Sequence, residues 1–255
     1  MKTQDDLSPN EGFALLLVGA PKTGKTTLSM AFPSPYFLDC EGNLQAAARR
    51  YPGKRFWYDR VDIADNGTPV PDDQRWVRAM HLLNEARKNP DVKTIVVDTL
   101  NRLSEWLCEM LVNDSQQATK PLIIGGMKCM TQSHWFPFST TLRKFVGTLR
   151  SIPDKLIICN VHEKTDKDEV LGTLMYKPSI GGQNADSIGG MFSDVWRCQA
   201  TACQPDKQFP HGVKYEVRTM PTPRMQLGNS LGLPADFVFT WDEVARRIQE
   251  NSKKL

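Results

Sequence analysis

The chain has 255 residues and a mass of 28.8 kDa; 40% of its residues are hydrophobic and 24% are charged. These proportions are ordinary for a globular protein and exclude a disordered tail, a collagen-like fibre and a coiled-coil rod. The formal net charge of +3 is too small to indicate a nucleic-acid-binding protein by bulk charge, although a local basic loop remains compatible with it.

The elements predicted along the chain alternate between strands and helices. Continuous apolar runs predict buried strands at 13–18, 36–40, 94–98 and 155–160, with another strand at 55–61. Helical spacing and breaker residues predict helices at 25–32, 72–88, 100–112, 140–150 and 241–250. Residues 195–202 and 213–220 are expected to pair as an antiparallel hairpin. The alternation favours a single α/β domain over 1–255 with a mostly parallel central sheet.

The remaining segments bear on location and on metal binding. Residues 1–12 form a polar leader unlike a signal or transit peptide, and no apolar run approaches the ~18 residues of a membrane span, so we expect a cytoplasmic protein without a membrane partner. Of the six cysteines, only Cys198 and Cys203 lie near each other in the sequence. His211 follows them and could supply a third metal ligand. Their spacing matches no zinc pattern.

The loop after the first strand carries the clearest chemical signal. Its sequence, Gly-Ala-Pro-Lys-Thr-Gly-Lys-Thr, matches the phosphate-loop pattern G-x-x-x-x-G-K-[ST] between a buried strand and a helix. Such a loop turns its backbone N–H groups toward phosphates, and its lysine and threonine meet the terminal phosphates and Mg²⁺. The pattern predicts that ATP with Mg²⁺ is bound by Gly19, Pro21, Lys22, Thr23, Gly24, Lys25, Thr26 and Thr27.

Three further residues follow buried strands whose carboxyl ends should meet at this site. Asp98 ends a strand and is expected to hold Mg²⁺ together with Thr26; alternatively it caps the helix that follows. Glu41 follows the second strand and is a candidate to polarise the attacking water, although a solvated turn acid fits equally well. His162, after the 155–160 strand, is a candidate γ-phosphate sensor or a structural histidine.

Taken together, these residues resemble the RecA-type ATPases, and most closely the small phage-encoded RecA-like single-strand annealing ATPases. The resemblance covers about residues 13–220 and rests on the phosphate loop, Phe37-Leu-Asp-Cys-Glu-Gly42, Thr94-Ile-Val-Val-Asp98 and Ile157-Ile-Cys-Asn-Val-His-Glu-Lys164. It implies a RecA-like fold with Glu41 as the catalytic base and His162 in place of a glutamine that couples nucleotide state to a DNA-binding loop. No N-terminal polymerisation helix or large C-terminal domain is recognisable, which places filament formation by the usual route in doubt.

The resemblance also implies partners. Loops at 113–138 and 163–190 would face single-stranded DNA, with Lys128, Trp135, Lys164 and Lys177 as candidate contacts; Trp135 and Phe136 could instead anchor the next helix. In a ring or filament of identical subunits, Arg218 or Lys214 would act on a neighbour's nucleotide, although charges on an edge strand are also ordinary. Other phage replication or recombination proteins are possible partners, in the host cytoplasm.

Three functions follow from this interpretation. The first is a DNA-stimulated ATPase that acts on single strands in phage recombination or replication. The second is a nucleotide-switched interaction module with slow hydrolysis. The third is a small-molecule kinase, which the absence of arginine from 113–138 and 163–190 disfavours because such kinases use arginine-rich lids.

Overall fold

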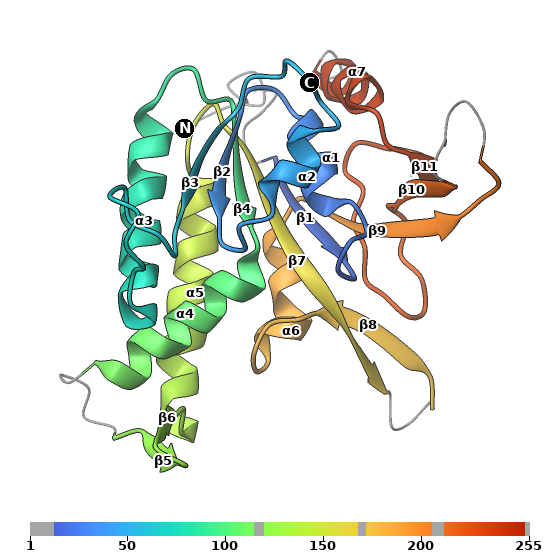
Figure 1. The fold of residues 1–255 in the computed structure, drawn as a ribbon. Helices are drawn as coiled ribbons and strands as arrows, with labels where there is room; N and C mark the ends of the chain where they lie inside the picture. The colour runs from blue at the N-terminus through green and yellow to red at the C-terminus, as the bar shows by residue number, and fades with distance from the viewer. Residues whose placement is uncertain (1–12, 115–119, 168–171, 206–211, 253–255) are drawn as a thin grey trace, which may run out of the picture.

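A computed structural model describes residues 13–114, 120–167, 172–205 and 212–252. Its main sheet has the strand order β11-β10-β9-β1-β7-β4-β2-β3. Strands β9, β1, β7, β4, β2 and β3 run parallel; β10 pairs antiparallel with β9, and β11 pairs antiparallel with β10. This is the predicted α/β architecture, a mostly parallel sheet with antiparallel strands near the C-terminus (Figure 1).

The strand bounds follow the apolar runs. The parallel strands are β1 (Ala14–Gly19), β2 (Pro35–Asp39), β3 (Trp57–Arg60), β4 (Thr94–Asp98), β7 (Leu156–Lys167) and β9 (Asp194–Ala202). The antiparallel strands are β10 (Val213–Arg218), β11 (Asp236–Val238) and β8 (Leu174–Pro178), the last of which pairs with β7. Every residue of β1, β2 and β4 is buried, as expected for strands covered on both faces.

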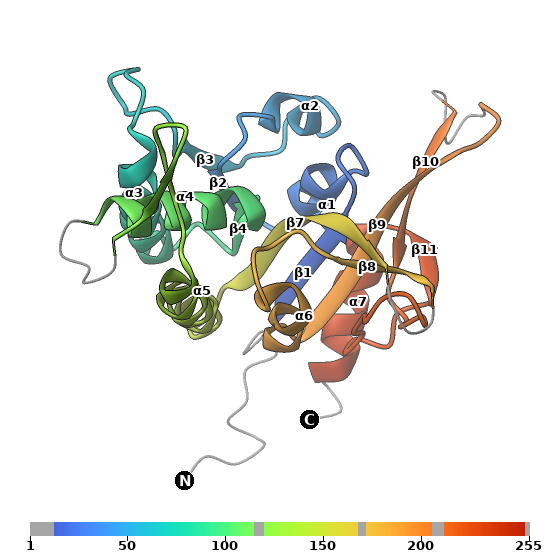
Figure 2. The same ribbon diagram turned by 90° about the horizontal axis from the view of Figure 1, so that it is seen from below.

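Helices cover both faces of the sheet. The cluster that contains Leu16 and Val18 of β1 packs against α3 (Asp72–Lys88), α4 (Leu100–Asn113) and α5 (Trp135–Arg150), which stand together in Figures 1 and 2. The cluster that contains Leu15 and Leu17 packs against α1 (Lys25–Ala31), α2 (Leu44–Ala48) and α7 (Trp241–Ser252). Alternate residues of one strand thus supply two cores.

Two regions expected as loops contain regular structure, and in the second a short hairpin around 170–176 was expected. The 113–138 segment holds a hairpin of β5 (Leu122–Ile124) with β6 (Met127–Cys129), a short η2 turn (Gln132–His134), and the start of α5 five residues earlier than the predicted helix at 140. The 163–190 segment holds the outer half of β7, β8, α6 (Asn184–Ser187) and most of η3 (Ile188–Met191). The short elements α2 and β11 were not predicted either.

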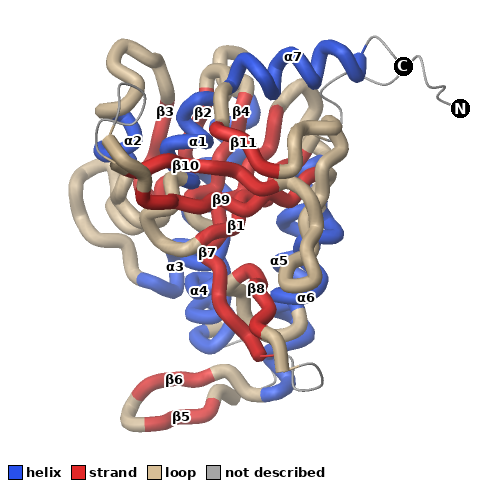
Figure 3. The backbone as a smooth tube through the Cα atoms, turned by 90° about the vertical axis from the view of Figure 1, so that its right-hand side faces the viewer, coloured by secondary structure: helices blue, strands red, loops and turns tan. Residues whose placement is uncertain are grey.

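Both hairpins extend from the same end of the molecule. Figure 3 shows β5–β6 standing clear of the main sheet, with the β7–β8 hairpin directed to the same side. β7 pairs with β4 up to Asn160 and with β1 up to His162, and from Glu163 onward it pairs with β8. Within the described ranges, no helix is long and apolar enough to cross a membrane.

Candidate nucleotide site

The phosphate loop connects β1 to α1 and folds around its own lysine. Lys22 and Gly24 adopt left-handed backbone conformations, with φ of 66° and 88°. The Lys25 ammonium is buried and donates to the carbonyls of Gly19 and Ala20, both at 2.8 Å. Burial lowers the pKa of Lys25, while nearby acidic groups oppose that shift. In the structure these two carbonyls are the hydrogen-bond acceptors of the ammonium. A bound polyphosphate would give it an anionic partner in their place.

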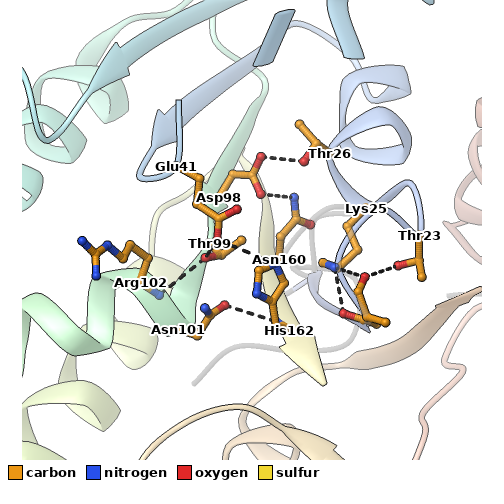
Figure 4. Close-up of polar contacts among 12 residues, drawn as sticks. Thr23, Lys25, Thr26, Glu41, Asp98, Thr99, Asn101, Arg102, Asn160 and His162 are labelled. Carbon is orange, nitrogen blue, oxygen red and sulfur yellow. Dashed lines mark hydrogen bonds and ion pairs between the residues drawn. The ribbon is translucent and has the colours of Figure 1, made fainter. Parts of the chain in front are cut away.

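Asp98 ends β4 inside a buried hydrogen-bond network. Its two carboxylate oxygens accept from the Thr26 hydroxyl at 2.8 Å and from the Asn160 amide at 2.9 Å. The Asn160 carbonyl in turn accepts from the Ser29 hydroxyl at 3.0 Å. Figure 4 shows the contacts of Asp98 with Thr26 and Asn160. Burial raises the pKa of Asp98 to about 6, and both hydrogen bonds counter that shift. Asp98 is therefore held by α1 and β7, as a metal-side carboxylate would be.

The oxygen pair suits Mg²⁺. The Thr26 hydroxyl and the Asp98 carboxylate already lie within 2.8 Å of each other beside the phosphate loop, and Mg²⁺ prefers such oxygen donors together with phosphate oxygens and water. A cation would also compensate a carboxylate that burial otherwise penalises. Thr26 and Asp98 are thus the residues that would hold the ion.

Glu41 is placed by the turn that follows β2. The Asp39 carboxylate accepts from the backbone N–H groups of Glu41 at 3.1 Å and of Gly42 at 2.7 Å, and Gly42 has a φ of 71° that favours glycine. The Thr99 hydroxyl then donates to Glu41 Oε1 at 2.7 Å. A hydrogen bond thus holds the Glu41 side chain toward the Asp98 end of β4, with a quarter of that side chain exposed (Figure 4).

His162 lies opposite Glu41. Its Nε2 is 3.7 Å from Glu41 Oε1, too far for a hydrogen bond, and its backbone N–H donates to the Asn101 side chain at 3.1 Å. Burial, followed by the nearby Lys25 charge, lowers the pKa of His162 and favours the neutral imidazole, while the Glu41 carboxylate opposes that shift. A neutral ring can still accept or donate one hydrogen bond to a ligand in the cleft.

These residues line one cleft of about 410 Å³, at the lower end of the range for ligand pockets. Its walls include Lys25, Thr26, Glu41, Asp98 and His162. The residues that the sequence pattern predicted from four separate strand ends therefore meet, because the strands are parallel and their carboxyl ends share one edge. Pro21, Lys22, Gly24 and Thr27 also line the cleft. Gly19 and Thr23 do not: the Gly19 carbonyl accepts from Lys25, and the Thr23 hydroxyl donates to the Ala20 carbonyl, both at 2.8 Å.

Sequence reasoning assigned no role to four residues around the cleft. Asn160 is a buried amide in an otherwise apolar strand segment. A polar residue in such a run was the sequence signal that could have identified it. Thr99 follows Asp98, and its hydroxyl contacts both Glu41 and the backbone N–H of Arg102 at 3.5 Å. Arg50 and Tyr215 also line the cleft, and they come from segments far from the phosphate loop in sequence, so no local pattern pointed to them.

The candidate DNA contacts lie on the two hairpins and α5. Lys164 is exposed on β7, while Lys128 of β6 donates to Asn113 at 2.8 Å and Lys177 of β8 pairs with Asp166 and Asp186. Trp135 begins α5, and a Cβ at Gly181 would lie 3.0 Å from its ring, so the indole covers the backbone there. That contact favours the anchoring alternative for Trp135, whereas the neighbouring Phe136 remains 79% exposed.

The two candidates for action on a neighbouring subunit, Arg218 and Lys214, both make ion pairs within the chain. Arg218 contacts Asp236 at 2.7 Å and Lys214 contacts Glu216 at 2.6 Å. Partly exposed pairs of this kind contribute little stability, about 0–1 kcal/mol, and can exchange for another anion.

The cysteines behave as isolated thiols. Cys40, Cys159 and Cys198 are buried, and burial raises the pKa of Cys198 to about 12. The described part of the chain contains no cluster of three His, Cys, Asp or Glu side chains that could hold a metal. His211, the third residue considered with Cys198 and Cys203, lies outside the described residues.

Comparison with known protein families matches residues 11–229 to the AAA domain family. No curated protein matches the chain. The match spans β1 to the segment after β10, and so includes every residue of the cleft described above. A domain of this family binds a nucleotide and is of the ATPase type, in agreement with the phosphate loop and its acidic partners. The chain belongs to the AAA domain family of phosphate-loop ATPases.

Proposed function

We propose that this chain is a RecA-like ATPase that hydrolyses ATP with Mg²⁺ and couples the reaction to single-stranded DNA, in the manner of phage recombination or replication proteins. The observation that carries the proposal is the course of β7, which brings His162 to the cleft and continues without a break into the exposed β7–β8 hairpin. A shift of His162 on loss of the γ-phosphate could then be transmitted along the β7 backbone to the hairpin surface that bears Lys164 and Lys177.

In the proposed reaction, water attacks the γ-phosphorus and the bond to the β,γ-bridging oxygen breaks, which yields ADP and phosphate. Glu41 orients the water and accepts its proton, while Lys25 neutralises charge on the phosphate oxygens. Thr26 and Asp98 hold Mg²⁺, which when bound offsets the charge of the triphosphate. Thr99 is the positioning residue that fixes one oxygen of Glu41 and leaves the other available to water.

The base of the hairpin is rigidly attached to the sheet. Arg197 of β9 makes a bidentate pair with Glu163 at 2.9 and 3.1 Å, and its guanidinium lies 3.9 Å from the centroid of the Tyr176 ring. The next backbone contact, Ser179 N–H to His162 O, measures 2.7 Å. These contacts tie β7, β8 and β9 together one residue beyond the cleft, which supports transmission from His162 to the hairpin.

The test is ATP hydrolysis with and without single-stranded DNA at two salt concentrations. We expect stimulation that weakens as salt rises, because phosphate contacts release counterions. Lys164→Ala on the hairpin should reduce the stimulation but not the basal rate. Lys88→Ala on α3, which removes one exposed lysine elsewhere, is the matched control.

Slow turnover that DNA does not change would contradict the DNA-coupled function and favour a nucleotide-switched module, with the hairpins as protein contacts. The nucleotide part of the proposal has its own test. Lys25→Ala should abolish triphosphate binding in calorimetry, and wild-type affinity in that variant would refute it. A concentration-dependent rate would indicate the ring or filament in which Arg218 or Lys214 acts on a neighbour.

A further inference from the structure

The β5–β6 hairpin carries a concentration of exposed apolar side chains. Leu122, Ile123, Ile124 and Met127 are 53%, 66%, 56% and 68% exposed. In the described ranges, six of the ten exposed large hydrophobic side chains lie between residues 122 and 136. Single apolar side chains are common on protein surfaces, but several on one projecting segment indicate a surface that another molecule covers.

The outer edge of this hairpin is open. Figures 1 and 3 show β5 as its outer strand, and the hairpin forms a two-stranded sheet of its own. Gly125 and Gly126, with φ of 57° and 82°, make a two-residue turn, which a hydrogen-bonded pair closes, here Ile124 with Met127. Because hydrogen-bonded and non-hydrogen-bonded pairs alternate, the N–H and C=O of Ile123 point away from β6. Within the described residues, no strand pairs with that outer edge.

An edge of this kind favours the addition of another strand. A lone two-stranded hairpin is only marginally stable in water, and it gains stability when further strands join it. Edge strands that remain unpaired commonly carry lysine or proline, which oppose pairing. The sequence of β5 is Leu-Ile-Ile and contains neither. The β5 edge therefore has both the backbone groups and the side chains for strand pairing.

The sequence of β5 is complementary to itself. In an antiparallel pair of two β5 strands centred on Ile123, each Leu122 lies opposite Ile124 of the other copy, and the two Ile123 residues lie opposite each other. The outward N–H and C=O of each Ile123 then bond to those of the other copy. The same pairing through β6 would place Lys128 opposite Lys128, and directly opposed like charges are destabilising. The geometry thus selects a second copy as the partner and β5 as the contact.

The exposed area is adequate for a reversible dimer. Phe136, at the start of α5, is 79% exposed and adds to the four side chains of the hairpin. Together these five side chains expose roughly 600 Å² per copy, if a fully exposed one presents about 200 Å². A standard interface covers about 800 Å² per partner. Strand pairing covers part of the available area, so the contact belongs with weak interfaces, whose dissociation constants are roughly micromolar.

We infer that the β5–β6 hairpin joins two copies of this chain into a two-fold dimer through antiparallel pairing of their β5 strands. The inference is independent of the proposed function. A two-fold contact uses the same edge of both copies, so it closes on itself and does not propagate into a ring or filament. Because the β7–β8 hairpin is directed to the same side, the dimer would bring both β7–β8 hairpins to the end where the copies meet (Figure 3).

The test is sedimentation velocity on the full chain without nucleotide, from about 1 to about 100 µM. We expect monomers at the low end and dimers at the high end. Ile123→Lys places like charges at the centre of the pairing and should raise the dissociation constant by about tenfold or more. Val77→Lys, which changes a 60% exposed side chain on α3 in the same way, is the matched control and should dimerise like the wild type.

A cross-link reports the register and guards against a folding defect in the lysine variant. Ile123→Cys should give a covalent dimer with a short bis-maleimide. Lys128→Cys should not, because the two β6 strands would lie three strand spacings apart, about 14 Å. The parent chain, with its partly exposed Cys129, gives the background.

Two results would overturn the inference directly. They are a wild-type chain that stays monomeric at about 100 µM, and a dimer that Ile123→Lys leaves intact. Other ligands of the hairpin are tested with the same variant, by its DNA-stimulated hydrolysis and by its binding to vesicles of phosphatidylcholine with phosphatidylglycerol. Loss of either property in Ile123→Lys, together with a monomeric wild type, would assign the hairpin to that ligand and refute the dimer.

Discussion

Replacing Thr99 with valine tests how Glu41 is positioned. The substitution keeps the shape of the side chain but removes the hydroxyl that donates to Glu41 Oε1 at 2.7 Å. A hydrogen bond to a charged group contributes about 1.5–3 kcal/mol, equivalent to roughly a 10- to 150-fold change in rate if the transition state alone uses it. Because the Glu41 side chain is 25% exposed, water replaces part of the contact, and we expect a loss in kcat near tenfold.

The assay is phosphate release at saturating and limiting ATP, so that kcat and KM are measured separately. Thr99 also caps α4 through the Arg102 N–H at 3.5 Å, a long contact whose loss costs about 0.5 kcal/mol or little more. Thermal unfolding records that structural part, and Thr99→Ser should restore both contacts. A folded Thr99→Val protein with wild-type kcat would refute the positioning role; a change confined to KM would do so as well.

Three further outcomes follow from the geometry. Asn160→Leu removes the buried donor to Asp98 and should lower the free energy of unfolding by about 1–3 kcal/mol in urea titrations; an unchanged midpoint would contradict the network. Gly42→Ala strains a residue at φ 71° by about 1–2 kcal/mol and should reduce turnover more than ATP affinity, because the turn at Gly42 places Glu41, the proposed base. Equal losses of turnover and affinity would argue against that role of the turn. Cys198, whose pKa burial raises to about 12, should resist iodoacetamide at pH 8 while the partly exposed Cys129 reacts; mass spectrometry distinguishes them, and rapid modification of Cys198 in the folded chain would contradict its burial.

The sequence predicted the parts of the fold whose physics is local. A run such as Leu15 to Val18 cannot be solvated, so it indicated a buried strand whatever its partners were. The phosphate loop was equally local, because its glycines, lysine and threonine act within eight residues. Parallel strands with a common carboxyl edge then place Asp98 and His162 near that loop. The structure brings these residues together as predicted.

The features that the sequence did not indicate depend on distant pairing. The outer half of β7 is polar and exposed, and its ladder with β8 makes it a strand; the sequence predicted a short hairpin around 170–176 but ended the buried strand at 160. Trp135 was expected in a loop, but it begins α5 directly after the capping box of Thr131 and His134, and its ring lies over the backbone at Gly181. Likewise Tyr215 reaches the phosphate loop only through the register of β10 with β9, which no pattern of spacing encodes.

Substitution of Glu41 by glutamine tests the central claim, that this cleft hydrolyses a nucleoside triphosphate with Glu41 as the base. The change keeps the size of the side chain and its contact with Thr99 but removes the proton acceptor. Phosphate release and ATP affinity are measured on the same preparation. We predict wild-type affinity with hydrolysis lower by about 10²–10⁴-fold, the usual contribution of general-base catalysis. Hydrolysis at the wild-type rate, or a loss of affinity as large as the loss of rate, would contradict the account.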